Sequence, residues 1–305
     1  MTDTTLTKSA IEPVSFALYE ADFERFSKAL GDSFRRYGFA VISDYDMEQS
    51  RIDSAIDAAK RFFALPEEVK KQYAVGKGGQ RGYIPFGIET AKGATHHDLK
   101  EFWHMGRDLP PGHRYEPSMP PNVWPAETPD FRDRISWLYG ALDRMGVKVL
   151  QAIAHYLNLP RHQFDEAVRE GNSVLRLLHY PPIPKDATGV RAGAHGDINA
   201  ITLLLGAEEG GLEVLDRDGE WLAINPPPGC LVINIGDMLE RATNDVLPST
   251  VHRVVNPPPE RRGFARYSTP FFLHGCATAD NPDRYPESIT ADEFLMQRLR
   301  EIKLL

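Results

Sequence analysis

The C-terminal half of the chain is divided into short apolar runs by turn-forming residues. These runs begin after Ser173, and breaks such as DRDG, PPPG and NPPPERRG separate them. Short runs rich in β-branched and apolar residues, bounded by proline and glycine, are typical of strands in sandwiches, barrels and jelly rolls. The runs are SVLRLLHY, AITLLL, GLEVLD, EWLAIN, CLVINIG, STVHRVV and ARYSTPFFL. The sequence therefore predicts an all-β region that begins near residue 173.

The N-terminal half has helical periodicity instead. Between Ala21 and Tyr37 the apolar residues recur every three or four positions, and Gly38 follows where a helix C-terminal glycine belongs. A strand, FAVISDY, comes next. Further helices are predicted over residues 47–63, 65–73 and 129–157, the last with a stripe of Phe131, Ile135, Leu138, Leu142, Met145 and Val149. The predicted fold class is therefore α+β.

Composition limits the class of function. The 305 residues carry a formal net charge of −8, with 42% hydrophobic and 26% charged residues, which is the balance of a globular protein. An acidic chain does not favour binding to nucleic acid or an anionic membrane, which need clustered Lys and Arg. The N-terminal sequence has no apolar run of signal-peptide type, so we expect a cytoplasmic protein. Cys230 and Cys276 lie in apolar runs and are expected to be buried thiols.

Three residues of the β region form a candidate metal site. His195 and Asp197 are two residues apart, so within a strand they would face the same way. His252 lies among β-branched residues in another run, an unfavourable position for an imidazole without a partner. Two imidazoles and one carboxylate leave three positions open at an octahedral ion. The alternative is a polar turn before a buried strand, with hydrogen-bonded core histidines.

Arg266 and Ser268 form a candidate carboxylate clamp further along the chain. Strand alternation places both side chains on one face. A guanidinium fork can bind both oxygens of a carboxylate, and a neighbouring hydroxyl can add a third hydrogen bond. The alternative is an outward-facing arginine in a surface ion pair, which would contribute little.

The combined motifs resemble a known family. His195-x-Asp197, His252 after a further 55 residues, and then Arg266-x-Ser268 are similar to the iron(II) and 2-oxoglutarate-dependent oxygenases, specifically the isopenicillin N synthase-like branch. The segment GGLEVLDRDGEWLAINPPPGCLVINIGDMLERATNDVLPSTVHRVV resembles that branch almost throughout. SFRRYGFAVISDY and RGYIPFG resemble its N-terminal portion. The resemblance extends from about residue 12 to about residue 280.

The resemblance implies a fold and a division of the chain. The fold would be a double-stranded β-helix, a form of jelly roll, with a helical N-terminal region and flanking helices. Residues 1–172 would form the helical region with a few strands, packed on the core. Residues 173–280 would form the double-stranded β-helix core, and residues 281–305 a C-terminal helix.

The resemblance also implies site residues and an activity. His195, Asp197 and His252 would hold Fe(II), and no catalytic residue beyond these ligands is expected. Arg266 and Ser268 would bind the far carboxylate of 2-oxoglutarate. The enzyme would convert 2-oxoglutarate and O2 to succinate and carbon dioxide while hydroxylating, desaturating or cyclising a small organic substrate.

Other positions match the family's sequence pattern only in part. Tyr180 matches a family tyrosine in an Asn-Tyr-Tyr-Pro-Pro segment and would contact the cosubstrate. Leu178 and His179 stand where the family often has Asn and Tyr. Candidates for substrate contact come from a glycine-bounded loop that could act as a lid, from KEFWHMG and from the segment after the clamp. They are Arg81, Tyr83, Phe86, Glu89, Phe102, His104, Phe272 and His274.

Three alternative functions remain at this level. Isopenicillin N synthase itself uses no keto acid, and its Arg-x-Ser binds a carboxylate of the substrate instead. A non-catalytic binding protein could keep the jelly roll and a cavity. A zinc hydrolase is less favoured, because no evident general base flanks the three metal-binding candidates. The sequence identifies neither the primary substrate nor the oligomeric state.

Overall fold

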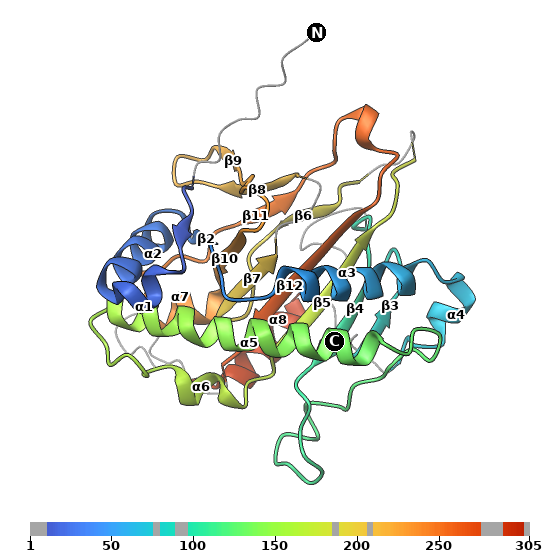
Figure 1. Cartoon of the computed structure of the whole chain (residues 1–305), viewed down its shortest axis with the longest axis horizontal. Coiled ribbons are helices and arrows are strands. Elements are labelled where there is room, and N and C mark those ends of the chain that lie inside the picture. The colour runs from blue at the N-terminus through green and yellow to red at the C-terminus, as the bar shows by residue number, and fades with distance from the viewer. Residues whose placement is uncertain are drawn as a thin grey trace.

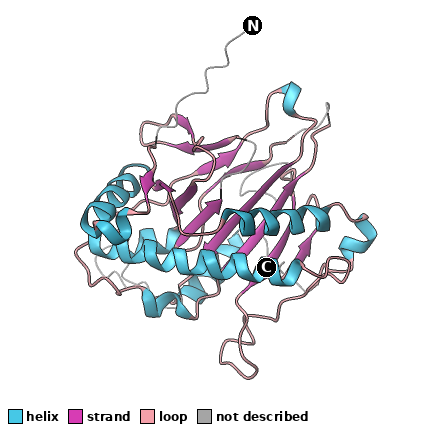
Figure 2. Cartoon of the chain, in the orientation of Figure 1, coloured by secondary structure: helices cyan, strands magenta, loops and turns pink. Residues whose placement is uncertain are grey.

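Two β-sheets stand face to face, and helices cover the outer side of the larger one (Figures 1 and 2). The computed structural model describes residues 11–75, 80–88, 97–184, 189–205, 210–275 and 289–301. Strands and helices are both abundant, and the facing sheets form a jelly-roll core. The predicted α+β jelly roll is therefore confirmed.

The larger sheet has eight strands. One pair at its edge, residues 14–15 with 42–43, is parallel, and every other neighbouring pair is antiparallel. Four of its strands come from the N-terminal half, so both halves of the chain build one sheet. In spatial order the strands are β1 (Val14–Ser15), β2 (Phe39–Ser43), β10 (Leu231–Ile235), β7 (Ile201–Leu205), β12 (Arg266–Leu273), β5 (Val174–Tyr180), β4 (Glu101–Gly106) and β3 (Gly82–Ile84).

The smaller sheet has four antiparallel strands. Its order is β6 (Ala192–His195), β11 (His252–Val254), β8 (Leu212–Leu215) and β9 (Trp221–Ala223). The described helices are α1 (Leu18–Ala21), α2 (Phe23–Tyr37), α3 (Gln49–Phe63), α4 (Glu67–Lys71), α5 (Phe131–Tyr156), α6 (Asp165–Arg169), α7 (Asp237–Ala242) and α8 (Ala291–Glu301), with a 3-10 turn at Pro259–Arg261.

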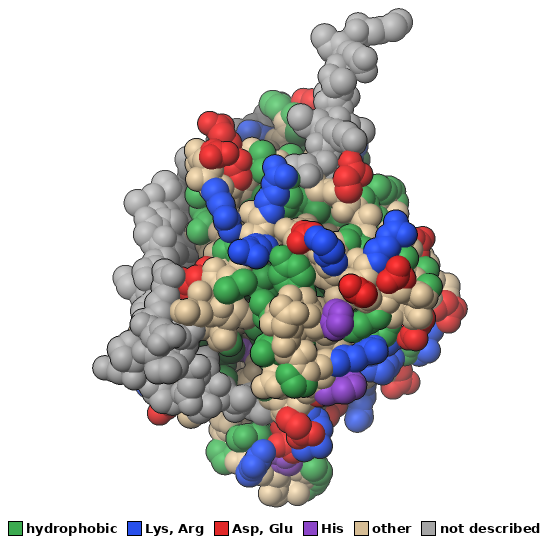
Figure 3. All heavy atoms as spheres, turned by 90° about the vertical axis from the view of Figure 1, so that its left-hand side faces the viewer, with side chains coloured by type: hydrophobic (Ala, Val, Ile, Leu, Met, Phe, Trp, Pro, Cys, Tyr) green, Lys and Arg blue, Asp and Glu red, His purple; other side chains and the backbone are tan. Residues whose placement is uncertain are grey.

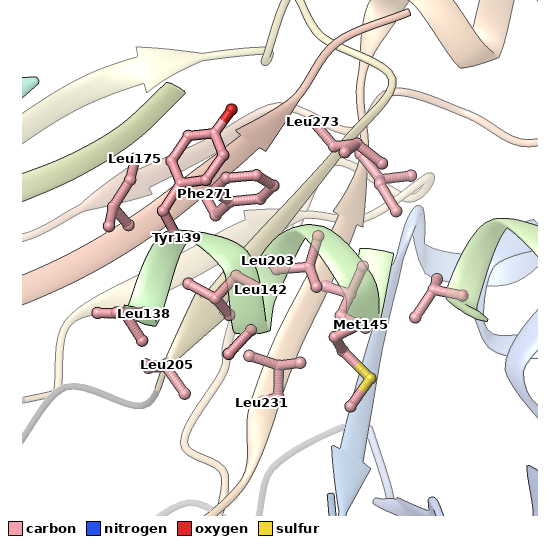
Figure 4. Packing of buried hydrophobic residues seen from close by; sticks show 14 of the residues in the cluster. Leu138, Tyr139, Leu142, Met145, Leu175, Leu203, Leu205, Leu231, Phe271 and Leu273 are labelled. Carbon is pink, nitrogen blue, oxygen red and sulfur yellow. The ribbon is translucent and has the colours of Figure 1, made fainter. Parts of the chain in front are cut away.

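Helix α5 packs on the large sheet through the apolar stripe that its sequence predicted. Every residue of its predicted stripe is at most 2% exposed, and the stripe packs on the leucines and phenylalanine of β5, β7, β10 and β12 (Figure 4). Burial of each such side chain contributes about 1.5–3 kcal/mol. The predicted helix C-terminus is also confirmed, since Gly38 adopts the left-handed conformation with φ 68°.

Some elements differ from the sequence expectations. Part of the expected lid is strand β3, paired with β4, and residues 76–79 of that loop lie outside the described part. Strands β4 and β6 and the short helix α7 were not anticipated. Cys230 is a buried free thiol as expected, whereas Cys276 lies outside the described residues.

Two smaller apolar clusters lie at different places on the side of the large sheet that faces away from the helices. One includes Phe39, Val41, Val214 and Val232, from β2, β8 and β10. The other joins Ile84, Phe102, Leu178 and Tyr180, from β3, β4 and β5.

On the face in Figure 3, acidic and basic side chains are interspersed among apolar ones. None of the helices in the described part is both long and apolar enough to cross a bilayer.

Candidate metal centre

The three candidate ligands converge between the sheets. His195 ends β6 and His252 begins β11, and the two residues are direct partners across these strands. Their imidazole centroids are 4.5 Å apart. Asp197 Oδ1 lies 3.9 Å from His195 Nε2 and 3.8 Å from His252 Nε2. One donor atom from each residue lies within 4.8 Å of the other two.

Asp197 is not oriented by the strand alternation that was expected from its sequence. It lies beyond the end of β6. Its backbone carbonyl instead accepts a hydrogen bond from Asp237 N at 2.7 Å. Gly236 allows this close approach, because a Cβ there would lie 2.1 Å from Asn199 O. The loop is therefore fixed by β10 and α7 rather than by its own strand.

The carboxylate of Asp197 is oriented by two buried side chains. Its Oδ2 accepts hydrogen bonds from the Thr202 hydroxyl and, at 2.8 Å, from Asn234 Nδ2. These bonds leave Oδ1 as the atom that faces the histidines. Such partners fix the direction of a metal-binding carboxylate and commonly change metal affinity 10–100-fold when lost, an order-of-magnitude figure.

Backbone carbonyls set the tautomers of both histidines. His195 Nδ1 lies 2.7 Å from Gly193 O, and His252 Nδ1 lies 3.2 Å from Thr250 O. A carbonyl oxygen can only accept, so each Nδ1 carries the proton. Each Nε2 therefore has its lone pair available on the side of Asp197, which is the form that binds a metal ion.

Electrostatics keep His195 and Asp197 in the protonation states of metal ligands. Burial, with the adjacent His252, lowers the pKa of His195 to about 4, so its imidazole is neutral near pH 7. Burial alone would raise the pKa of Asp197, but the two histidines, Asn234 and Thr202 together hold it below its usual value. A neutral imidazole and a charged carboxylate are the states that metal binding requires.

A buried ion pair supports the strand that carries His195. Lys100 Nζ lies 2.9 Å from Asp98 Oδ2, and both side chains are almost fully buried. Asp98 Oδ1 accepts a hydrogen bond from Gly193 N at 3.1 Å, and Gly193 O in turn accepts from His195. The ion pair thus holds the strand that carries His195.

The candidate carboxylate clamp lies on the inner face of the large sheet. Arg266 is 3% exposed, which excludes the surface ion pair considered above. It pairs with Tyr180 across β12 and β5, and its Cζ lies 5.1 Å from the Tyr180 ring centroid. Ser268 is buried two residues further along the same face. A second fully buried arginine, Arg191, lies 6.0 Å from the same ring.

Four predicted substrate residues lie on or beside that inner face. Phe102 packs in the inner cluster with Leu178 and Tyr180. Its ring centroid is 4.9 Å from that of His104, and Phe272 continues the same face of β12. His274 is buried, and burial lowers its pKa to about 4.

The other four predicted substrate residues are placed elsewhere. Tyr83 packs in the core on the helix side of the sheet and hydrogen-bonds Glu101, opposite to the direction of Phe102. Arg81 is buried against Gly106, where an added Cβ would lie 1.9 Å from its Cζ. Phe86 is 48% exposed, and Glu89 lies outside the described residues.

Three polar residues of the inner face were missed at the sequence level. Thr202 and Asn234 are each a lone polar residue in an otherwise apolar strand, ITLLL and LVINI. Arg176 stands two and four residues before Leu178 and Tyr180, so alternation places it on their face. An unexplained polar residue in an apolar strand was the signal in each case.

Family models match most of the described chain. Residues 11–127 match the model described as non-haem dioxygenase in morphine synthesis N-terminal. Residues 171–275 match the 2OG-Fe(II) oxygenase superfamily. This second segment contains His195, Asp197, His252 and the candidate clamp.

Curated relatives and solved structures agree with these matches. The chain is 35% identical over 285 residues to a 2-oxoglutarate-Fe(II) type oxidoreductase of Emericella nidulans, covering 85% of this chain and 79% of the relative. A Caulobacter crescentus protein assigned to the 2OG-Fe(II) oxygenase family has a structure with TM-score 0.91 and 74% identity, covering 96% of this chain and 99% of that one. Neurospora crassa T7H in complex with alpha-KG and thymine has TM-score 0.84 and 29% identity, with 95% and 96% coverage.

The chain therefore belongs to the 2OG-Fe(II) oxygenase superfamily. It is an oxidoreductase, a non-haem 2-oxoglutarate-dependent dioxygenase, with Fe(II) as cofactor and 2-oxoglutarate and O2 as cosubstrates.

Proposed function

We propose that His195, Asp197 and His252 are the iron ligands of this dioxygenase. The observation that supports this most directly is the convergence of two Nε2 atoms on one carboxylate oxygen, with each ligand held by a further hydrogen bond. Two imidazoles and one carboxylate suit Fe(II) and leave positions open for other ligands. A structural zinc site would close all of them.

We further propose that Arg266, Ser268 and Tyr180 bind the far carboxylate of 2-oxoglutarate. Arg266 is buried on the inner face of the sheet, and the fork of its guanidinium matches the two oxygens of a carboxylate. Tyr180 and Ser268 flank it on the same face and can donate through their hydroxyl groups. Relatives named as 2-oxoglutarate-dependent enzymes favour this assignment over an oxidase that uses no keto acid.

The residues of the chain then have separate tasks. With Fe(II) bound, 2-oxoglutarate and O2 yield succinate and carbon dioxide, and one oxygen atom is available to the substrate in a hydroxylation. The clamp fixes one end of the cosubstrate, while Thr202 and Asn234 keep the Asp197 carboxylate directed at the ion. The apolar side chains around the candidate ligands, such as Phe39 beside His252, help to exclude bulk water there.

Finer assignments rest on the sequence and the relatives. We place the chain in the isopenicillin N synthase-like branch, with residues 1–172, 173–280 and 281–305 as its helical region, core and C-terminal helix. We propose a small organic molecule as primary substrate, since a solved relative is named with thymine. Phe102, His104, Phe272 and His274 are its proposed contacts. Cytoplasmic location and the absence of nucleic-acid and membrane partners stay predictions.

Iron binding by matched histidine variants tests the ligand set. Fe(II) affinity is measured anaerobically by equilibrium dialysis for the wild type, for His252→Ala and for His155→Ala. His155 is an exposed histidine of α5, so its variant makes the same chemical change away from the site. The proposal expects Fe(II) affinity to fall at least about 100-fold in His252→Ala and to stay unchanged in His155→Ala. Loss of a ligand should weaken binding more than loss of a residue that supports a ligand. Unchanged affinity in His252→Ala would contradict the ligand assignment.

A further inference from the structure

A partly exposed patch interrupts the buried inner face of the large sheet. It spans the adjacent strands β4, β5 and β12 (Figure 1). His104, Arg176 and Phe272 are partly exposed there, whereas the inner-facing Phe102, Leu178, Tyr180, Arg266 and Ser268 are buried. Solvent therefore reaches the inner face at this patch, and so could a substrate.

Arg176 is held firmly at the centre of the patch. Its Nε donates a hydrogen bond to His104 Nε2 at 2.7 Å, and the two residues are partners across β4 and β5. Its Cζ lies 4.2 Å from the Phe102 ring centroid and 5.2 Å from that of Phe272. Contacts with two aromatic rings and a hydrogen bond through Nε fix the plane of the guanidinium.

The patch is connected to the candidate metal centre through the strand register. Phe272 pairs with Thr202 across β12 and β7. Thr202 in turn donates its hydroxyl hydrogen bond to Asp197. Arg176 therefore lies two strands from the strand that supports a metal ligand, on the inner face of the sheet.

Arg176 is distinct from the cosubstrate clamp. It stands four residues before Tyr180 on β5, about 13 Å along the strand at the usual rise per residue. Tyr180 is the partner of Arg266. Arg266 is thus placed for 2-oxoglutarate, and Arg176 is a second cation further along the same face of the sheet.

We propose that Arg176, positioned by His104, binds a carboxylate of the primary substrate. A rigid guanidinium fork between aromatic rings suits a planar anion and leaves apolar surface for the ring or chain attached to it. The substrate class is then a small organic acid with an apolar part. This inference rests on the proposed function, because it assigns a substrate to the same site.

Pairs of acids and amides test the inference. The probes are benzoate, phenylacetate and 3-phenylpropionate, each with its primary amide, which keeps the shape and removes the charge. Binding is measured by ligand-observed NMR on the protein with saturating Fe(II) and 2-oxoglutarate under nitrogen. The variants are Arg176→Leu and Arg176→Lys. The control is Arg253→Leu, because Arg253 also stacks on a ring, Trp221 at 3.9 Å, but faces away from the interior.

The inference expects at least one acid to bind about tenfold or more tightly than its amide, which is the scale of a charge-assisted hydrogen bond. Arg176→Leu should abolish this preference, Arg176→Lys should keep part of it, and Arg253→Leu should keep all of it. The inference is overturned if no acid binds the wild type, if the preference survives in Arg176→Leu, or if the acids bind only when 2-oxoglutarate is left out. Failure of the proposed function would appear separately, as an absence of 2-oxoglutarate binding to the wild type.

Discussion

The two faces of the large sheet use the same alternation of side chains for different purposes. On β5, Leu175 and Leu177 join the core beneath the helices, whereas Arg176 and Tyr180 face the interior. On β12, Phe271 and Leu273 are outward and Arg266 and Ser268 are inward. The outer face gains stability from many similar apolar contacts. The inner face depends on single polar groups, each with a specific partner. Substitutions on the two faces should therefore change different measurable quantities.

The largest effect on stability is expected at the outer face. Leu142→Ala removes a fully buried side chain of α5 that packs on the sheet (Figure 4). The free energy of unfolding should fall by about 2–5 kcal/mol, measured by urea denaturation, while the Fe(II) affinity of the folded protein stays the same. Leu159→Ala, the same change at a residue 40% exposed, is the control and should cost far less. Equal losses in both variants would contradict the described packing.

The largest effect on cosubstrate binding is expected at the inner face. Arg266→Leu should weaken 2-oxoglutarate binding on the order of 100-fold, because the carboxylate loses a buried charged partner. The measurement is the KM for 2-oxoglutarate in succinate release, with Arg253→Leu as the outward-facing control. An unchanged KM in Arg266→Leu would show that the clamp lies elsewhere.

A pair of threonines makes the sharpest comparison between the faces. Thr202 and Thr269 are both buried in adjacent strands of the large sheet, but only Thr202 donates to Asp197. Thr202→Val should lower Fe(II) affinity about 10–100-fold, and Thr269→Val should leave it unchanged. Equilibrium dialysis under nitrogen measures both, and similar affinities in the two variants would refute the supporting role of Thr202.

The smallest effect concerns a polar exception on the outer face. Glu101 is buried there and is bound by Lys70 at 2.7 Å and by His179 and Tyr83. Burial would raise its pKa, but His179, Lys70 and Tyr83 hold the pKa below the usual 4.5. A carboxyl with a lowered folded-state pKa stabilises the protein above its unfolded pKa, and this stabilisation is lost as the pH falls.

The gap in unfolding free energy between the wild type and Glu101→Gln should therefore narrow as the pH falls below about 4.5. Urea denaturation at several pH values measures this gap. A gap that stays constant or widens on acidification would mean that the charge of Glu101 does not stabilise the fold.

Local patterns predicted the outer face well. The three- and four-residue spacing of the α5 stripe and the glycine after α2 depend on neighbours in sequence, so they could be read without the structure. Strands β5, β7, β8, β9, β10, β11 and β12 also followed from their apolar runs. The pairing of β4 with β5 could not be read in this way, because it joins segments about 70 residues apart.

The sequence predicted which residues form the candidate site, but not which hydrogen bonds hold Asp197 in place. The spacing of His195, Asp197 and His252 indicated a metal site, and the structure brings their donor atoms together. Alternation would have oriented Asp197 only within a strand, whereas a loop held by Asp237, Thr202 and Asn234 performs that task. Hydrogen bonds between residues far apart in the chain follow no helix or strand spacing, so the sequence pattern does not reveal them.

Succinate release tests the central claim, that the inner face holds an iron- and 2-oxoglutarate-dependent active centre. Purified wild type, Asp197→Ala and Asp57→Ala are each supplied with Fe(II), 2-oxoglutarate and O2, and succinate is quantified. Asp57 is an exposed aspartate of α3 and provides the matched control. The account predicts succinate from the wild type and Asp57→Ala that depends on both Fe(II) and 2-oxoglutarate, and none above background from Asp197→Ala. Equal succinate release by Asp197→Ala would contradict it.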